Sequence, residues 1–194
     1  FKAYYALLQG GGLAPKSSYA SYKSMLTDFM SYVNYFTPMI FAALAVAVAL
    51  RAGLFNIGVS GQMLAAGFTA SIVVGYSSLN AVLAKPLVVI IGLIVGGLVG
   101  ALIGFLKYRF NINEVVSSIM LNYTFQYVIS FFINTFFVDP VSRQSKEISA
   151  ASRLTLMDTM VGNLKMDIPL GIILALLTVV ALAGSHLLAS PYAV

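Results

Sequence analysis

The chain alternates between long apolar runs and short polar segments that carry nearly all of its Lys, Arg, Asp and Glu residues. A helix needs about 20 predominantly apolar residues to cross the roughly 30 Å hydrocarbon core of a membrane. Runs near that length predict an all-α fold, a polytopic transmembrane helical bundle. The five predicted spans are Tyr35–Leu50, Gln62–Tyr76, Leu87–Leu106, Asn113–Val138 and Ile168–Leu188.

Residues 1–33 precede the first span and are amphipathic rather than apolar throughout. They contain scattered Lys residues, many Tyr residues and a break at Gly10-Gly11-Gly12. Tyr suits a membrane–water boundary because its ring is apolar and its hydroxyl is polar. We predict a short interfacial helix, a glycine turn and a second helix that enters the bilayer. The chain then divides into an amphipathic extracytoplasmic segment, residues 1–33, and a transmembrane domain, residues 34–194.

The polar segment between the first two spans is the most unusual part of the pattern. Arg51–Gly67 holds a cation, an Asn, a Ser, a Gln and several glycines between two apolar runs. Irregular backbone beside a membrane span is tolerated only at the water interface or where it lines a protein cavity. One interpretation is a tight interfacial turn. The other is a broken or re-entrant helix near residues 51–64, whose freed amides and polar side chains meet a substrate.

The fourth span carries a polar residue at every fourth position. Four residues turn a helix by about 400°, so these positions form a stripe that drifts by about 40° per step. Polar groups inside a span usually face the bundle or a wet cavity. The stripe therefore either makes interhelical hydrogen bonds or lines a pathway. Its members are Glu114, Ser118, Asn122, Gln126, Ser130 and Asn134.

The third span carries glycines four residues apart, which places them on one slowly drifting helix face. Such a face lets a neighbouring helix approach closely. We therefore predict a helix-packing role for Gly92, Gly96, Gly100 and Gly104.

The composition supports a membrane protein. Hydrophobic residues make up 60% of the chain, charged residues 9%, and the mean hydropathy is +0.94. The absence of Cys excludes disulfides and cysteine-ligated metals. His186 is the single histidine, so no metal site is predicted. The net charge of +5 is spread over isolated cations, which favours a role in membrane topology over nucleic-acid binding.

The cations in short loops predict an orientation. Arg51 lies between the first and second spans, and Lys107 with Arg109 lies between the third and fourth. The positive-inside rule places both turns in the cytoplasm. The loops at residues 77–86 and 139–167 then lie outside.

Motifs for catalysis are missing from the sequence. It contains neither a phosphate-binding G-x-x-x-x-G-K-[ST] loop nor a G-x-S-x-G nucleophile elbow. The apolar spans offer no pair of carboxylates for acid–base chemistry, since Glu114 is the only acid beside them. We therefore predict that the chain is not an enzyme and carries no cofactor. If ATP powers transport, ATP and Mg²⁺ bind to another subunit.

Two separated motifs carry a resemblance to a known family. The first is G-L-F-N-I-G-V-S-G-Q-M at residues 53–63, and the second is K-Y-R-F-N-I-N-E-V-V at residues 107–116, followed by M-L-N-Y at residues 120–123. Together they resemble permease subunits of bacterial ABC importers for nucleosides and simple sugars, the ribose-type branch. The N-E-V…M-L-N-Y form favours nucleosides over ribose. One departure is Ser60, where the family usually has Glu.

The resemblance implies a multi-pass protein of the bacterial inner membrane that forms the translocation path of an ATP-driven importer. Its implied partners are a second permease subunit, two ATP-binding subunits and an extracytoplasmic substrate-binding protein. Relative to the family, the chain is expected to lack spans at both ends and the coupling helix. The implied substrate path comprises Phe55, Asn56, Ser60, Gln62, Ser118, Asn122, Tyr123 and Gln126. The implied cytoplasmic and coupling side comprises Arg51, Lys107, Arg109, Asn113 and Glu114.

Other functions stay open at this point. A permease for ribose-like sugars would use the same architecture. An ion-coupled secondary transporter also uses broken helices but needs an intramembrane acid or histidine, and both Glu114 and His186 lie near span ends. The polar stripe disfavours a third possibility, a purely structural or assembly membrane protein.

Overall fold

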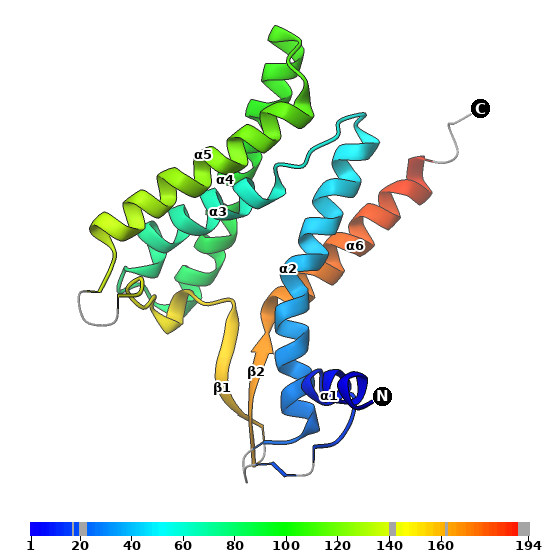
Figure 1. Cartoon of the computed structure of the whole chain (residues 1–194), viewed down its shortest axis with the longest axis vertical. Helices are drawn as coiled ribbons and strands as arrows, with labels where there is room; N and C mark the ends of the chain where they lie inside the picture. Colours follow the sequence, from blue (N-terminus) through cyan, green and yellow to red (C-terminus); the bar gives the residue numbers. More distant parts are fainter. Residues whose placement is uncertain (17, 20–22, 140–142, 162, 190–194) are drawn as a thin grey trace. The chain divides into compact units, whose positions relative to one another are not determined.

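The computed structural model describes residues 1–16, 18–19, 23–139, 143–161 and 163–189 (Figure 1). The described part is mostly helical, as predicted. Its helices are α1 (Lys2–Gly10), α2 (Met25–Arg51), α3 (Val59–Ala70), the π-helix η1 (Ser71–Gly75), α4 (Ala81–Phe110), α5 (Glu114–Phe136), the 3-10 helix η2 (Ala150–Ser152) and α6 (Leu170–Ala189). Its strands are β1 (Thr155–Val161) and β2 (Leu164–Pro169).

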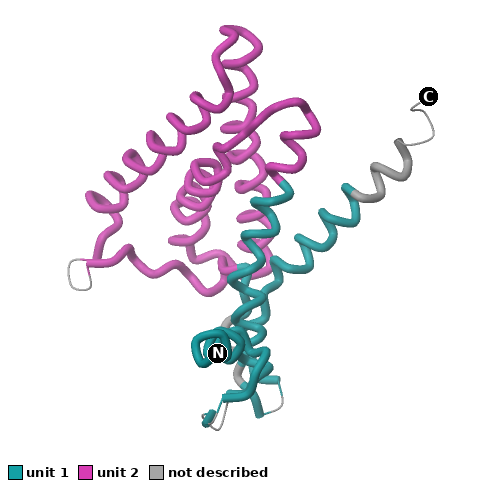
Figure 2. Tube along the Cα trace, turned by 45° about the vertical axis from the view of Figure 1, so that its right-hand side comes forward, with its two compact units in different colours: residues 1–44, 154–194 teal, residues 45–153 magenta. Residues whose placement is uncertain are grey.

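The chain forms two compact units (Figure 2). Unit 1 comprises residues 1–44 and 154–194, and unit 2 comprises residues 45–153. This division reflects which residues pack together. The predicted division at residue 33 instead separates an extracytoplasmic segment from a transmembrane domain, and it stays a prediction.

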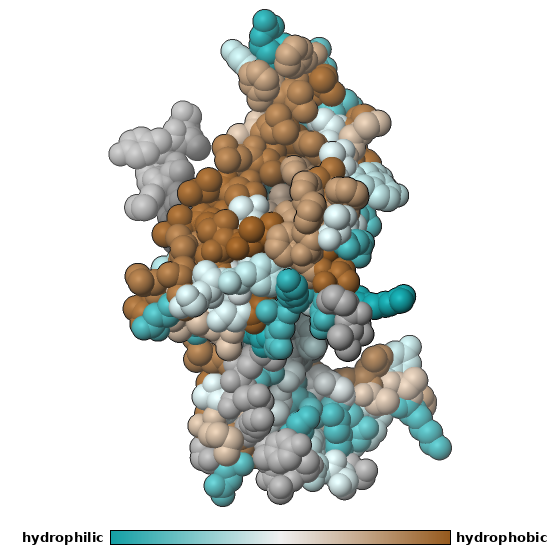
Figure 3. Space-filling model, turned by 90° about the vertical axis from the view of Figure 1, so that its left-hand side faces the viewer, coloured by the Kyte–Doolittle hydropathy of each residue, from teal (hydrophilic) through white to brown (hydrophobic). Residues whose placement is uncertain are grey.

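Three helices are long and apolar enough to cross a membrane: α2, α4 and α5. Apolar side chains cover much of the surface that Figure 3 shows. Leu93 on α4 and Phe131 on α5 are 71% and 63% exposed. Large apolar side chains at such exposure suit contact with lipid, so the surface supports the membrane interpretation. The predicted second and fifth spans correspond to shorter apolar helical stretches, Val59–Gly75 and Leu170–Leu182.

Two predicted span boundaries are wrong because each helix continues through a proline. The first span was predicted to begin at Tyr35, but α2 begins at Met25 and continues through Pro38. Pro86 was predicted in a loop, but it lies inside α4. A proline removes one backbone donor and usually disfavours a helix interior. Long apolar helices tolerate it in membranes, where neighbouring groups satisfy the freed carbonyl.

Unit 1 contains the one sheet of the described residues, a feature that the sequence analysis missed. Strands β1 and β2 pair antiparallel, with Thr155 opposite Pro169 and Val161 opposite Leu164. The predicted loop at residues 139–167 is therefore wrong for its C-terminal part. The Thr155 hydroxyl donates to Asn34 Oδ1 at 2.7 Å, which ties the hairpin to α2 within this unit.

The N-terminal residues of unit 1 match the predicted order of short helix, glycine turn and second helix. α1 ends at Gly10, and Gly12 adopts a left-handed φ of +68°. A Cβ at Gly12 would lie 2.7 Å from the Met25 carbonyl oxygen, so only glycine fits this approach to α2.

Unit 2 packs α3 against α4 and α5. Small and β-branched side chains fill the contact: Ala65, Val99 and Ile103 are buried, and Ser118 is fully enclosed. Small residues let helix backbones approach closely where no hydrophobic driving force operates between helices in lipid.

The loops of unit 2 gather at opposite ends of its helices. The residues before α3 contact the α4–α5 end, since a Cβ at Gly58 would lie 2.9 Å from Ile103 and 3.2 Å from Ser118. At the other end, Ser149 N donates to the Gly75 carbonyl at 2.8 Å. The predicted cytoplasmic loops thus share one end, and the predicted outer loops share the other.

This arrangement predicts the side from which each end can be labelled. The chain has no Cys, so the single cysteines Arg109→Cys and Lys146→Cys can be introduced into a full-length protein from which any Cys elsewhere has been removed. A membrane-impermeant maleimide should label Lys146→Cys in intact cells and Arg109→Cys only after permeabilisation. The reverse pattern would contradict the predicted orientation.

Candidate functional site

The break between α2 and α3 forms from residues 52–58. Gly53 adopts a left-handed φ of +72°, and Leu54 N donates back to the Ala49 carbonyl at 2.9 Å, which ends α2. The chain then runs without regular structure to Val59, where α3 begins. The broken segment predicted near residues 51–64 is therefore present.

The broken segment lies inward from the tip of the α4–α5 hairpin. Gly58 approaches Ile103, which is seven residues before the end of α4 at Phe110. At 1.5 Å per residue this places Gly58 roughly 10 Å from the end of that helix. The end of the segment at Gly58 is therefore buried against α4, whereas Ala52, Gly53, Phe55 and Ile57 are exposed.

Side-chain amides satisfy the polar backbone groups of the segment. Asn56 Oδ1 accepts a hydrogen bond from Gly58 N at 2.7 Å. Asn122 on α5 makes two such contacts: its Oδ1 accepts from Gly61 N at 2.7 Å, and its Nδ2 donates to the Ile57 carbonyl at 3.0 Å. We refer to these two hydrogen bonds as the Asn122 clamp.

The clamp supplies the helix cap that α3 lacks locally. Gly58 is the N-cap residue and makes no side-chain capping bond. The first four N–H groups of a helix have no partner within it, and Gly61 N is one of them. Asn122 therefore caps α3 from a different helix, 61 residues further along the chain.

Close approach between α3 and α5 requires glycine at the clamp. A Cβ at Gly61 would lie 2.7 Å from Asn122 Oδ1 and 3.1 Å from Asn122 Cα. Gln62 turns toward α4, where its Nε2 would lie 3.3 Å from a Cβ at Gly100. The polar face of α3 is thus held between two helices.

The structure brings together half of the predicted path residues. Asn56, Gln62, Ser118 and Asn122 gather around the broken segment, and the Ser118 hydroxyl donates to the Val115 carbonyl at 3.0 Å. The others are exposed in the described structure: Phe55, Ser60, Tyr123 and Gln126. The assignment of all eight to a substrate path stays a prediction.

Four of the five predicted coupling residues lie at the turn between α4 and α5. Lys107 Nζ lies 2.7 Å from Glu114 Oε1, and Asn113 Oδ1 caps α5 by accepting from Val115 N at 2.9 Å. Arg109 lies over the ring of Phe110, and Arg51 is exposed at the end of α2. Their coupling role stays a prediction.

The glycine stripe of α4 has one neighbour among the described residues, Gln62 beside Gly100. A Cβ at Gly92, Gly96 or Gly104 would meet nothing within 4 Å. These glycines present an open helix face, and their packing role stays a prediction. The side chain of His186 lies outside the described part of α6. Among the described residues, no group of three or more acidic or His side chains could hold a metal ion.

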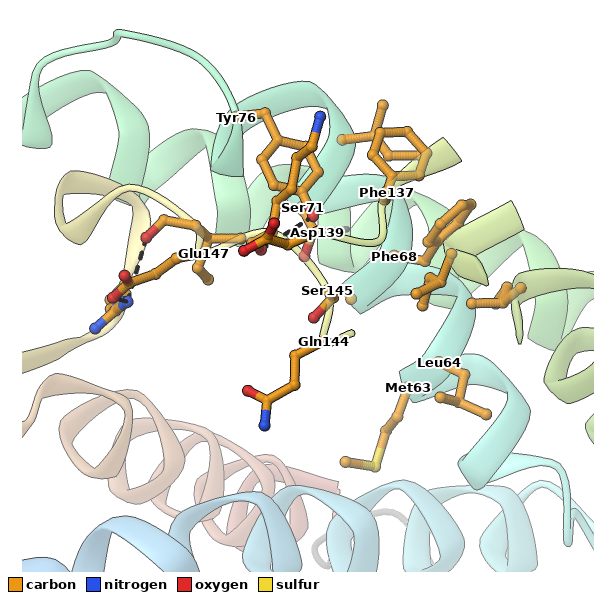
Figure 4. Close-up of a pocket in the computed structure, with 17 residues that line it drawn as sticks. Met63, Leu64, Phe68, Ser71, Tyr76, Phe137, Asp139, Gln144, Ser145 and Glu147 are labelled. Atoms are coloured by element: carbon orange, nitrogen blue, oxygen red, sulfur yellow. Dashed lines mark hydrogen bonds and ion pairs between the residues drawn. The ribbon is translucent and has the colours of Figure 1, made fainter. Parts of the chain in front are cut away.

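Sequence reasoning missed a pocket of about 840 Å³ at the end of unit 2 away from Lys107 (Figure 4). Its apolar wall includes Phe68, Tyr76 and Phe137, and none of the predicted path residues lines it. The polar lining residues are Ser71, Asp139, Gln144, Ser145, Lys146, Glu147 and Arg153. These residues belong to a helix end and a loop that had no distinguishing motif, and only folding brings them together.

Comparison with known proteins identifies the family. The family model described as "Branched-chain amino acid transport system / permease component" matches residues 29–189. The chain is 37% identical over 155 residues to the nucleoside ABC transporter permease protein NupB of Lactococcus lactis subsp. cremoris. That match covers 75% of the chain and 42% of NupB. It is 38% identical over 150 residues to the guanosine ABC transporter permease protein NupP of Bacillus subtilis, covering 76% of the chain and 42% of NupP.

A more distant relative is the glucose ABC transporter permease protein TsgB13 of Haloferax volcanii, 32% identical over 96 residues, which is 50% of the chain and 25% of TsgB13. No solved structure matches the chain significantly. The chain thus spans less than half the length of the nucleoside permeases that it matches. Because the family model covers most of the chain and the apolar helices fit membrane spans, the chain is a multi-pass membrane protein that belongs to this family of ABC transporter permease components.

Proposed function

We propose that the chain is part of the membrane-spanning permease subunit of an ATP-driven importer and contributes to the translocation path for nucleosides. The observation that carries this proposal is the similarity to two nucleoside permeases over three quarters of the chain. The family description names branched-chain amino acids, but the more similar relatives are named for nucleosides. The M-L-N-Y motif at residues 120–123 favours the same branch.

The geometry of unit 2 is compatible with a path beside the broken segment. In the Asn122 clamp, both polar atoms of the Asn122 side chain form hydrogen bonds to backbone atoms. The main role of Asn122 is therefore to hold α3 in place. Exposed polar side chains on either side of it, Ser60 and Gln126, are then the groups available to a passing substrate. Tyr123, which is 57% exposed, offers an aromatic face to a base.

The proposed assembly follows from the ABC permease family. ATP hydrolysis would take place in separate ATP-binding subunits, a second permease subunit would complete the path, and an extracytoplasmic protein would deliver substrate. This chain itself would need no cofactor. Permeation of simple sugars is the second candidate function, favoured by the similarity to a glucose permease.

Uptake by cells with and without the gene for the full-length protein tests the proposal. Deletion should abolish uptake of labelled uridine or adenosine, and excess unlabelled ribose should not compete. Loss of ribose uptake with unchanged nucleoside uptake would instead support the sugar function. Unchanged uptake of both would overturn the proposal.

A further inference from the structure

We infer that the 840 Å³ pocket of unit 2 is a nucleoside-binding site at the outer end of the permease, where substrate binds before it enters the path. The inference rests on the proposed function and adds to it a binding site that contains none of the predicted path residues. The pocket lies between α3, η1, the end of α5, Asp139 and residues 144–153, all within unit 2 (Figure 4).

The apolar wall of the pocket is built from aromatic rings in contact with one another. The rings of Tyr76 and Phe137 are stacked with centroids 5.4 Å apart, and Phe68 meets Phe137 edge-on at 6.1 Å. Phe68 also contacts Phe132 on α5. Exposed aromatic rings bind nucleobases by stacking, whichever base is present, because every base has a flat π-face.

The pocket is also lined by polar residues, which suit a sugar with several hydroxyls. The Ser71 and Ser145 hydroxyls can each donate or accept a hydrogen bond. Glu147 pairs with Arg153 at 2.7 Å and supplies further acceptor capacity. A lipid chain or an apolar helix in this pocket would bury the Ser71 and Ser145 hydroxyls without offering them a hydrogen-bond partner, which costs free energy. A nucleoside offers a base to the aromatic wall and ribose hydroxyls to the polar lining residues.

The π-helix η1 shapes the aromatic wall. Tyr76 N donates to the Ser71 carbonyl five residues earlier, at 3.1 Å. One extra residue in a helical turn rotates everything after it by about 100°, so the π turn determines which way the Tyr76 ring points. π-helical turns are frequent at functional sites. Gly75 lets Ile148, which lines the pocket, pack closely on η1, since a Cβ there would lie 2.9 Å from Ile148 Cγ2.

The position of the pocket fits the arrival of substrate from outside. It lies at the end of unit 2 where Tyr76 Oη donates to the Lys146 carbonyl at 3.3 Å, opposite the basic α4–α5 turn. Under the predicted orientation this end faces away from the cytoplasm. A volume of this size is within the range of about 300–1,000 Å³ that small-molecule sites occupy.

Filling the pocket tests the inference. Gly67 lines the pocket, and a Cβ there would meet nothing within 4 Å, so the side chain of Gly67→Leu starts in open space and can extend into the pocket. The matched control is Gly97→Leu on α4, where a Cβ also meets nothing within 4 Å and no pocket residue lies. Both are made in the full-length protein with its partner subunits. The amount of each variant in the membrane is measured alongside transport.

Two readouts use defined probes. Uptake of labelled uridine at limiting concentration should fall about tenfold or more in Gly67→Leu, on the scale of losing one base–aromatic contact, while Gly97→Leu stays close to the wild type. Photolabelling with 8-azidoadenosine should modify a peptide that contains Tyr76 or Phe137, and Gly67→Leu should prevent it.

The outcomes separate the two proposals. If the wild-type protein takes up no nucleoside, the proposed function fails. If it takes up nucleosides and Gly67→Leu transports equally well, the function stands and the pocket inference is wrong. If Gly67→Leu lowers only the amount of assembled protein, with transport per molecule unchanged, another protein segment fills the pocket and the inference is also overturned.

Discussion

Replacement of Asn122 by Leu is expected to lower the free energy of unfolding of the full-length permease by about 2–4 kcal/mol and to abolish uptake. The substitution removes both hydrogen bonds of the Asn122 clamp. Gly61 N then loses its capping partner, and the Ile57 carbonyl loses its donor. Gly61 is buried, so water cannot replace the lost partner at that amide.

The physical cause is the geometry of a broken helix in a membrane. Capping contributes about 1 kcal/mol at an exposed helix start, and an unsatisfied buried backbone group costs about 1–3 kcal/mol more. The Asn122→Leu change would also leave the residues before α3 free to leave their position beside Ile103 and Ser118. The path would then lose its shape even though every proposed substrate contact remained.

Asn134→Leu provides the matched control for this prediction. It makes the same side-chain change on the same helix and in the same polar stripe, at an exposed position. Unfolding of the purified protein by denaturant should distinguish the two variants, with Asn134→Leu close to the wild type. Asn122→Asp should fall between them, because a carboxylate can accept from Gly61 N but cannot donate to Ile57. Equal stability of Asn122→Leu and the wild type would show that the clamp contributes nothing.

The sequence predicted the broken segment and the polar stripe but could not decide what the stripe does. Both interpretations of Asn122 fit its spacing on α5. Its hydrogen-bond partners lie 61 and 65 residues earlier in the chain, on a segment whose path is set by tertiary packing. Periodicity reports which face of a helix is polar and carries no information about the group that this face meets.

The β-hairpin of unit 1 was missed for a different reason. Residues 139–167 were grouped as one polar loop because their charges are balanced. A local signal was present: the dipeptide Gly162-Asn163 separates two runs that both contain Leu, Met and β-branched residues. Two residues of this type between such runs favour a hairpin. Prolines caused the opposite error. In soluble proteins a proline usually marks a helix end, but Pro38 and Pro86 lie inside long helices here.

The pocket of unit 2 was beyond sequence reasoning altogether. Phe68 and Phe137 lie on either side of η1, α4 and α5 in the chain, and nothing in their spacing predicts their contact. The ring of Tyr76 stacks on Phe137 only because η1 inserts a π turn, and a π turn has no sequence signature in the pattern of apolar residues. The pattern of apolar residues therefore predicted the helices but not the pocket that forms where they pack together.

Gly61→Ala is expected to cost about 2–4 kcal/mol of stability, as much as loss of the clamp itself. The added methyl group would lie 2.7 Å from Asn122 Oδ1 and 3.1 Å from Asn122 Cα. The amide oxygen can move away only by breaking its hydrogen bond to Gly61 N, and the Cα can move only if α5 shifts. Alanine is otherwise better than glycine inside a helix by about 1 kcal/mol, so any loss of stability must come from this contact.

Gly97→Ala isolates that contribution, because it makes the same change in α4 where a Cβ meets nothing within 4 Å. We expect it to be neutral or slightly stabilising in the same unfolding measurement. The double variant Gly61→Ala with Asn122→Ala should cost less than the sum of the single variants, since each change alone already breaks the same contact, and residues in contact typically couple by about 0.5–3 kcal/mol. Strict additivity would mean that Gly61 and Asn122 act independently. The position of α3 would then depend on packing against α4, and the clamp would be a consequence of that packing rather than its cause.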